Sequence, residues 1–472
     1  MKLEKVNYKG FIVPVVIGLL FWFFTPLRPA GVSVISWHLL ALFVATILGC
    51  ITKPLPIAGV AIIGLVLTVI LGVAPMKLAM TAFGDAAVWM IALAYMLSRG
   101  FIKTGLGHRI ALQFIKLFGQ KTLGLAYSME AIDLVTAPAT PSNTARCGGI
   151  VVPIIQSLAK AYGSDPKTGT QRKIGSFLLF AEYHINIVTS GMFMTAYAPN
   201  LVAVAIAKQM GINISWFTWF LAAIVPGLIL LVIVPFIIYK LYPPEIKETP
   251  HARSWAEKEL ADMGPMKLSE KMMLGVFLTA LVLWMLSSFI GLDATWVAFL
   301  AVALMLVSGV LSVQDILQET GAWNVILWFS ILIFMAGELN TLGFIPWLSK
   351  ALAGAMNGLA WGWVMAIILV FYVYIHYLFA SGTAQATALF GAMLGIAVSA
   401  HVPPLLAAML LCFGNTAMSS TTHYASGPAP VVYGLGYVEQ KDWWKNNAIM
   451  APLYLLIFGL IGALWMKVIG IW

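Results

Sequence analysis

The sequence predicts an all-α polytopic membrane protein of about 11 spans. The predicted architecture is two inverted repeats, each with about five spanning helices and a re-entrant hairpin, plus one extra N-terminal helix. Three observations support it. The 472 residues are 61% hydrophobic and only 10% charged, whereas a soluble domain carries about 25% charged residues. Apolar runs of roughly 18 residues recur along the chain, and polar stretches interrupt apolar regions in both halves of it.

The predicted elements follow one another in a simple order. Residues 1–33 hold the N-terminal helix, which we interpret as a retained span because no small-residue cleavage site follows it. Repeat one occupies 34–241, the charged segment 242–271 is a cytoplasmic linker, and repeat two occupies 272–472. We expect spans or broken spans at 10–28, 36–51, 56–73, 85–99, 123–160, 175–208, 216–240, 272–291, 294–312, 323–340, 358–400, 401–436 and 447–470.

Three short matches between the halves indicate an internal duplication, because they occur in the same order at similar offsets. The matching pairs are "GFIKTGLG" (100–107) with "GELNTLGF" (337–344), "SNTA" (142–145) with "SGTA" (381–384), and "TAYAPN" (195–200) with "THYASG" (422–427).

Loop charge predicts the orientation. The net charge of +9 is spread over short loops, which favours the positive-inside rule over nucleic-acid binding. Lys2, Lys5 and Lys9 place the N-terminus in the cytoplasm, an odd number of crossings per repeat inverts the second copy, and the C-terminus falls outside. Arg28 and Lys350 are the two exceptions. We expect the protein in a bacterial cytoplasmic membrane.

Segments 123–160 and 358–400 are the predicted hairpins. An arm of about 15 residues is roughly 22 Å long at helical rise, short of a bilayer core of ~30 Å. Non-helical backbone at this depth is tolerated only where it is buried in protein or lines a water-filled cavity. We therefore expect the two polar tips to meet near the middle of the membrane.

The tips carry residues suited to an anion. Helix N-termini follow them and present free N–H groups, and hydroxyl and amide side chains add donors. The alternative is that these residues only cap the second arm. The tip residues are Ser142, Asn143, Thr144, Ser381, Gly382 and Thr383.

The segments "PSNTARCGGIVVPI", "TSGMFMTAYAPN" and "TTHYASGPAPVVYGLGYV" resemble the divalent anion/sodium symporter family. The resemblance covers nearly the whole chain and is closest to the citrate/succinate, tartrate/succinate and 2-oxoglutarate/malate exchangers. It implies a homodimer that moves di- or tricarboxylates by an elevator-type movement, with the two tips holding the two carboxylates.

The sequence departs from the sodium-coupled members at Gly382, where they carry a second Asn. The helix breaks at Thr195 and Thr422 can still offer backbone carbonyls to a cation. Arg146 and His423 put positive charge near the site, and a fixed cation can replace sodium as counter-charge. We therefore expect a sodium-independent exchanger. A sodium- or proton-coupled symporter is the runner-up, and an anion channel is a more remote alternative.

Other polar residues have open interpretations. His184, His376 and Asn200 are candidates to support the site from behind, although His184 and His376 can equally be hydrogen-bonded packing residues. Further residues at membrane depth are Glu130, Asp133, Glu182 and Glu338, interpreted as proton carriers or hydrogen-bonding groups; His401, interpreted as interfacial; and Trp443, Trp444 and Trp472, interpreted as an aromatic belt.

Enzyme chemistry is not expected. The chain has no HExxH or GxSxG motif, and its three cysteines, Cys50, Cys147 and Cys412, show neither metal-ligand nor disulfide spacing. We expect no cofactor, metal or nucleic acid. The expected partners are the substrate, a second copy of the chain and the lipid bilayer.

Overall fold

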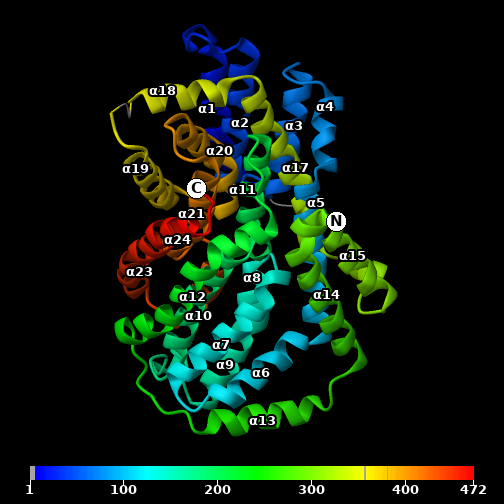
Figure 1. Cartoon of the computed structure of the whole chain (residues 1–472), viewed down its shortest axis with the longest axis vertical. Coiled ribbons are helices and arrows are strands. Elements are labelled where there is room, and N and C mark those ends of the chain that lie inside the picture. Colours follow the sequence, from blue (N-terminus) through cyan, green and yellow to red (C-terminus); the bar gives the residue numbers. More distant parts are fainter. Residues whose placement is uncertain (1–5, 356–357, 380) are drawn as a thin grey trace.

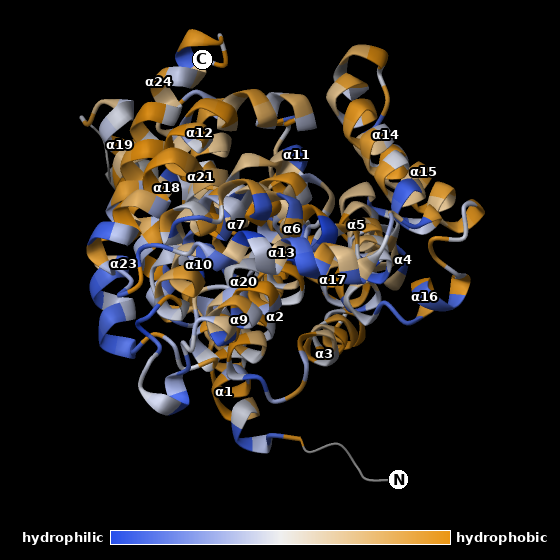
Figure 2. Cartoon of the chain, turned by 90° about the horizontal axis from the view of Figure 1, so that it is seen from below, coloured by the Kyte–Doolittle hydropathy of each residue, from blue (hydrophilic) through white to orange (hydrophobic). Residues whose placement is uncertain are grey.

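A computed structural model of the chain describes residues 6–355, 358–379 and 381–472. Every regular element in these ranges is helical, which confirms the all-α prediction (Figure 1). Eight of the described helices are long and apolar enough to cross a membrane, and four further apolar helices are shorter. Figure 2 shows hydrophobic residues over much of α12, α14 and α15 and hydrophilic residues on α16 and at the start of α23. The count of about 11 spans and the inversion of the repeats stay predictions.

The first half opens with α1 (Ile12–Phe23) packed against α2 (Val34–Thr52). Ser33 caps α2 by accepting a hydrogen bond from the Ser36 N–H, and Lys53 ends the helix in the left-handed region at φ 50°. The remaining helices of this half are α3 (Ile57–Ile70), α4 (Met76–Thr81), α5 (Ala86–Thr104), α6 (Leu106–Phe118), α7 (Thr122–Thr136), α8 (Asn143–Arg146), α9 (Val152–Ala161), α10 (Gly175–Met192), α11 (Ala198–Gln209) and α12 (Trp216–Leu241).

The linker contains α13 (His251–Met263), and the second half follows it. Its helices are α14 (Leu268–Ile290), α15 (Ala294–Val307), α16 (Val313–Leu317), α17 (Thr320–Thr341), α18 (Phe344–Ala355), α19 (Trp361–Tyr374), α20 (Gly382–Ser399), α21 (Pro404–Ala417), α22 (Pro428–Gly434), α23 (Gln440–Tyr454) and α24 (Gly462–Val468).

The first pair of matching segments lies at comparable places in the two halves, and the duplication itself stays a prediction. The segment 100–107 ends α5 and begins α6, and its match at 337–344 ends α17 and begins α18. Helices α5 and α17 also pack against each other. In each half a helix, a polar tip and a second helical arm come next.

The helices break where the sequence predicts. After α7 comes the short turn η4 (Ala137–Ala139), and the arm resumes as α8, the π-helical turn η5 (Cys147–Val151) and α9. In the second half η8 (Ile375–Leu378) ends α19 before α20 begins. Both arms around this second tip, Trp361–Leu378 and Gly382–Ser399, are long and apolar enough to span, so the re-entrant path remains a prediction.

Two predicted spans are also broken. Segment 175–208 divides into α10 and α11 around η7 (Met194–Ala196), and segment 401–436 divides into α21 and α22 around η9 (Met418–Ser420). These breaks carry the matching sequences "TAYAPN" and "THYASG".

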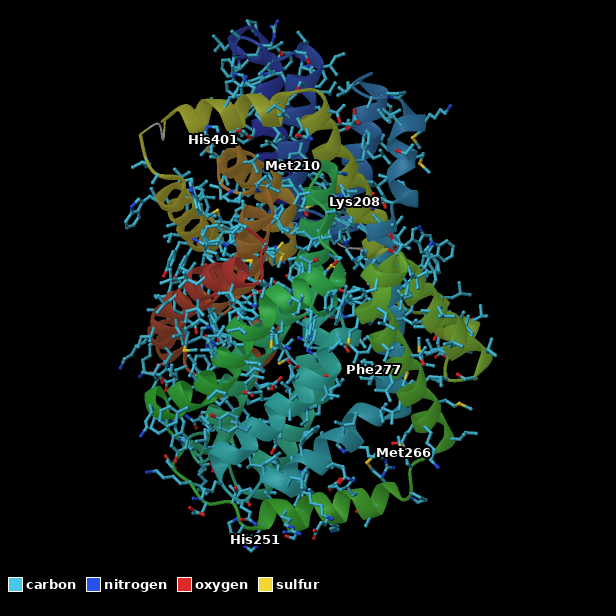
Figure 3. All side chains as sticks on the ribbon, viewed as in Figure 1. Lys208, Met210, His251, Met266, Phe277 and His401 are labelled. Carbon is cyan, nitrogen blue, oxygen red and sulfur yellow. The ribbon has the colours of Figure 1, made fainter. Side chains whose placement is uncertain are left out.

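The linker helix α13 lies at one end of the molecule, away from α1, α2 and α18 (Figure 1). His251, at the start of α13, lies at that end, and His401 lies toward the opposite one (Figure 3). Arg109 of α6 holds the linker by donating to Glu270 (2.7 Å) and to the Gly264 carbonyl (3.0 Å). Which end faces the cytoplasm stays a prediction.

One tryptophan prediction is wrong. Trp443 does not belong to an aromatic belt, because its side chain is fully buried and packs on the rings of Phe180 and Tyr183. Trp444 is 37% exposed, and Trp472 lies edge-to-face with Trp361.

Candidate functional site

The two polar tips line one cavity of about 470 Å³. All six predicted tip residues contribute to its wall, although 239 positions separate Ser142 from Ser381. The rest of the wall comes from the end of α2, the start of α3, one residue of α5, the break between α10 and α11, and the break between α21 and α22. The lining residues beyond the tips include Cys50, Ile51, Lys53, Ile57, Tyr95, Pro141, Tyr197, Ala198, Pro199, Ala384, Tyr424, Ser426, Gly427 and Pro430.

The serine of each tip caps the arm that follows it. The Ser142 hydroxyl oxygen accepts from the Ala145 N–H at 3.1 Å, and the Ser381 oxygen accepts from the Ala384 N–H at 3.3 Å. Both serines therefore cap a helix, as the alternative interpretation of the tips predicts. The two tips have the same local geometry in this respect. Each hydroxyl keeps its own hydrogen, so it can still donate into the cavity.

The lining of the cavity favours an anion. Lys53 carries the single formal charge among the lining residues that the structure describes, and no carboxylate is among them. Hydroxyls of Tyr95, Tyr197, Tyr424 and Ser426 add polar groups. Lys53 is exposed at the C-terminal end of α2, so its ammonium group remains hydrated while it adds positive potential.

Two glycines allow the segments to approach closely. A Cβ atom on Gly427 would overlap the Thr144 hydroxyl of the first tip, and a Cβ atom on Gly382 would overlap the Tyr197 hydroxyl. Tyr197 is buried and lies 3.2 Å from the Ser419 hydroxyl. Its hydroxyl therefore fills the space that a side chain at position 382 would need.

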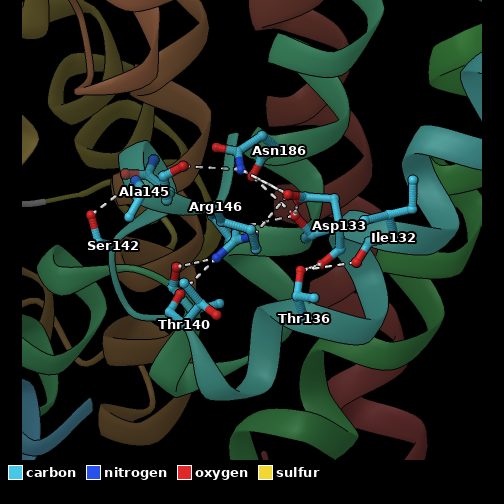
Figure 4. A network of polar contacts seen from close by, with 12 residues as sticks. Ile132, Asp133, Thr136, Thr140, Ser142, Ala145, Arg146 and Asn186 are labelled. Atoms are coloured by element: carbon cyan, nitrogen blue, oxygen red, sulfur yellow. Dashed lines mark hydrogen bonds and ion pairs between the residues drawn. The ribbon is translucent and has the colours of Figure 1, made fainter. Parts of the chain in front are cut away.

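Arg146 does not face the cavity, which corrects its predicted role as a counter-charge. Its guanidinium is fully buried and forms an ion pair with Asp133, with 2.9 Å between Nε and Oδ1. This pair joins the first tip to α7 and α10 (Figure 4). The remaining guanidinium nitrogens donate to the carbonyls of Thr140 and Ala196 and to the hydroxyls of Thr189 and Ser190.

With these donors engaged and its charge neutralised, Arg146 holds the tip in place. Asp133 also accepts from Thr189 and from Asn186, so the carboxylate too is fully engaged. Asn186 adds a longer contact of 3.4 Å to the Asn143 carbonyl, which connects the pair to the tip backbone.

Three other predicted residues lie outside the cavity wall. Thr195 donates to the Pro138 carbonyl at 2.5 Å and so ties η7 to the start of the first tip. Thr422 is fully buried. His423 accepts from the Trp444 indole N–H at its Nδ1 atom, 3.0 Å away, and is surrounded by aromatic rings.

The three residues predicted to support the site divide into two groups. His184 contacts Tyr454 and Asn447 at 3.0 and 3.1 Å, so it is a hydrogen-bonded packing residue of α10. Asn200 donates to the Ser190 carbonyl at 2.7 Å and stabilises the break after α10.

His376 does lie behind the cavity wall. Its Nε2 atom is 2.6 Å from the carbonyl of Ala425, a residue whose neighbours Tyr424 and Ser426 line the cavity.

A larger cavity, of about 780 Å³, lies elsewhere. It is formed by the start of α5, the end of α11 and the loop between α14 and α15, with Asp85, Lys208 and Asp293 in its wall. It contains residues of neither tip, and both charge signs line it. We therefore place the candidate site in the smaller cavity.

Sequence reasoning missed several residues of the wall. Lys53, Tyr95 and Tyr197 come from segments far from either tip in the sequence. Tyr197 and Gly427 do lie in the matching segments "TAYAPN" and "THYASG", so the repeat was a usable signal for those two. No sequence pattern around Lys53 indicates that this residue lies beside the two tips.

The fold and the polar cavity at its helix breaks define a membrane transporter. A crystal structure of the Alcanivorax borkumensis YdaH transporter has the same overall fold, with a TM-score of 0.55 over 98% of this chain and 99% of that one. Sequence identity is 12%, so this likeness concerns the fold alone.

The sequence profile described as "Sodium:sulfate symporter transmembrane region" matches residues 5–472, and the chain belongs to that family. The chain is 46% identical to the "Putative malate transporter YflS" of Bacillus subtilis (strain 168), covering 100% of this chain and 98% of the relative. It is 42% identical to the chloroplastic dicarboxylate transporter 1 of Spinacia oleracea (99% and 83%). It is 38% identical to the L-tartrate/succinate antiporter of Shigella sonnei (strain Ss046), covering 93% and 94%.

Proposed function

We propose that this protein exchanges dicarboxylates of the succinate, malate and 2-oxoglutarate class, with citrate as a tricarboxylate, across a bacterial cytoplasmic membrane without sodium. It works as a homodimer by an elevator-type movement of the segments that carry the tips. The observation that carries the proposal is the cavity shared by both tips, with a lysine and no carboxylate among its described lining residues.

Two tips at one cavity suit a substrate with two carboxylates. Asn143 and Thr144 on one side and Ser381 and Thr383 on the other offer amide and hydroxyl donors, and hydrogen bonds to a charged group contribute about 1.5–3 kcal/mol each. The relatives' names, which include a malate transporter, a dicarboxylate transporter and a tartrate/succinate antiporter, support the same substrate class.

Gly382 and Tyr197 support sodium independence. The second tip has no amide oxygen at position 382, and the Tyr197 hydroxyl occupies the space where a longer side chain would begin. A sodium ion binds through several oxygen ligands, so the second tip lacks one ligand that the first can provide through Asn143.

A proton-coupled carrier is the second candidate, and Glu182 is the observation that favours it. Glu182 is fully buried on α10, and neither carboxylate oxygen has a hydrogen-bond partner in the described part of the chain. A buried carboxyl group without partners is stable only when protonated, so Glu182 is a candidate to carry a proton during transport.

Uptake of labelled succinate into proteoliposomes tests the proposal. Vesicles are loaded with unlabelled succinate or left empty, and each type is assayed in sodium and in choline. We expect uptake only into loaded vesicles, with equal rates in both salts. Sodium-driven accumulation into empty vesicles would overturn the exchanger, and dependence on an imposed pH gradient would favour the Glu182 alternative.

A further inference from the structure

Tyr95 is the lining tyrosine whose hydroxyl faces the first tip. It comes from α5, and its hydroxyl is directed at the side chain of Ser142. The hydroxyls of the other two lining tyrosines are engaged elsewhere in the protein. That of Tyr197 lies 3.2 Å from a serine hydroxyl, and that of Tyr424 donates to a backbone carbonyl at 3.2 Å. Tyr95 is therefore the tyrosine placed to reach a group bound at the first tip.

The side of the cavity around Tyr95 offers few other polar groups. It is formed by the end of α2, the start of α3 and α5, and its other lining residues are Cys50, Ile51, Lys53 and Ile57. The isoleucines form no hydrogen bonds, a thiol is a weak donor, and Lys53 is exposed. Among the described residues of this side, Tyr95 thus contributes the one hydroxyl.

Gly321 determines where the Tyr95 ring lies. It belongs to the first turn of α17, which packs against α5. A Cβ atom at position 321 would lie 2.8 Å from Cδ1 and 2.9 Å from Cε1 of the Tyr95 ring, and 3.1 Å from a carboxylate oxygen of Glu319. Non-bonded carbon atoms attract best at about 3.5–4.0 Å, so only glycine lets the ring pack on α17 in this position.

We propose that Tyr95, positioned by Gly321, recognises an oxygen atom on the carbon next to the carboxylate that the first tip holds. This inference rests on the proposed function for its substrate. Because the Tyr95 hydroxyl is directed at Ser142, the carbon next to a carboxylate bound there comes close to this hydroxyl. Malate carries a hydroxyl on that carbon and 2-oxoglutarate an oxo group, whereas succinate carries only hydrogen.

Such a contact selects among substrates of the same charge. A phenol group both donates and accepts hydrogen bonds, so Tyr95 is suited to a hydroxyl and to an oxo group alike. The tips bind the carboxylates that all these acids share, and Tyr95 distinguishes what lies between the carboxylates. One hydrogen bond between neutral groups changes an affinity by about two- to tenfold.

The ratio of the malate to the succinate dissociation constant tests the role of the hydroxyl. Both constants are measured by calorimetry on the full-length protein in lipid nanodiscs. Tyr95→Phe keeps the ring and removes the hydroxyl, so we expect the ratio to rise about three- to tenfold. Tyr127→Phe is the matched control, because it removes a hydroxyl that donates to the Val232 carbonyl outside the cavity wall. It should change the ratio by less than about twofold.

Gly321→Ala tests the positioning without removing any lining group. The added methyl group displaces the Tyr95 ring, so the ratio should rise as it does for Tyr95→Phe. Gly275→Ala, in α14, is the control, because its Cβ atom meets nothing within 4 Å, and it should leave the ratio unchanged. Alanine is the more favourable residue in a helix interior, so both variants keep their helices.

The outcomes separate this inference from the proposed function. An unchanged ratio in Tyr95→Phe, in a protein that still binds both acids, would overturn the recognition by Tyr95 and leave dicarboxylate exchange intact. A ratio that changes in Tyr95→Phe but not in Gly321→Ala would overturn the positioning by Gly321. If the unaltered protein binds neither acid, the proposed function fails, and this inference fails with it.

Discussion

Replacing Arg146 by Gln should destabilise the protein before it alters substrate recognition. The substitution leaves the Asp133 carboxylate buried without its ion-pair partner, and breaking such a pair costs about 3–5 kcal/mol of unfolding free energy. Four further acceptors, on Thr140, Thr189, Ser190 and Ala196, lose their donor. Each buried group left without a partner costs about 1–3 kcal/mol, so the lower figure of about 3 kcal/mol is a minimum.

A double-mutant cycle measures this coupling directly. Arg146→Gln, Asp133→Asn and the double variant are unfolded with denaturant in micelles, and the double variant should lose less than the sum of the single losses. Lys441→Gln is the control, because Lys441 forms an exposed ion pair with Glu439, and such pairs contribute about 0–1 kcal/mol.

The opposite pattern would refute this reasoning. If Arg146→Gln is as stable as the unaltered protein and instead raises the succinate dissociation constant tenfold, the guanidinium faces the substrate. That outcome would restore the role that the sequence alone predicts for Arg146.

Two further substitutions test the packing and the charge of the cavity. Gly427→Ala should weaken succinate binding by about 1–3 kcal/mol, the cost of overpacking, because the new methyl group overlaps Thr144, whereas Gly434→Ala, whose Cβ meets open space, should leave binding unchanged in the same titration. Lys53→Gln should weaken succinate binding about two- to fivefold, as expected for an exposed charge, and should reduce its dependence on salt concentration; an unchanged salt dependence would show that Lys53 does not act on the substrate.

The sequence predicts the helical class and the positions of the breaks because both depend on local composition. Hydrocarbon excludes polar side chains, so the polar groups at 142–144 and 381–383 indicate breaks in the helices. This holds whichever helices pack against them. Composition does not tell which residue of a tip caps a helix and which one lines the cavity. In the second tip Ser381 caps α20, whereas Thr383, two positions later, lines the cavity.

The partner of a buried charged side chain could not be predicted in the same way. The sequence shows that Arg146 lies at membrane depth, but its partner depends on how α7 packs on the tip, and Asp133 lies 13 positions earlier. The oxygens around His376 belong to residues 9 and 49 positions away. Such contacts follow from tertiary packing, which no local pattern encodes.

The central claim is that a dicarboxylate binds between the two tips, and a pair of threonines on α20 tests it most directly. Thr383 lines the cavity, whereas Thr387, one turn later, is buried and donates to the Thr383 carbonyl at 2.8 Å. Succinate binding to Thr383→Ala and Thr387→Ala is measured by calorimetry with the protein in lipid nanodiscs. We predict a loss of about tenfold to a hundredfold for Thr383→Ala, the effect of one hydrogen bond to a carboxylate, and little change for Thr387→Ala. Equal affinities in the two variants would contradict the claim.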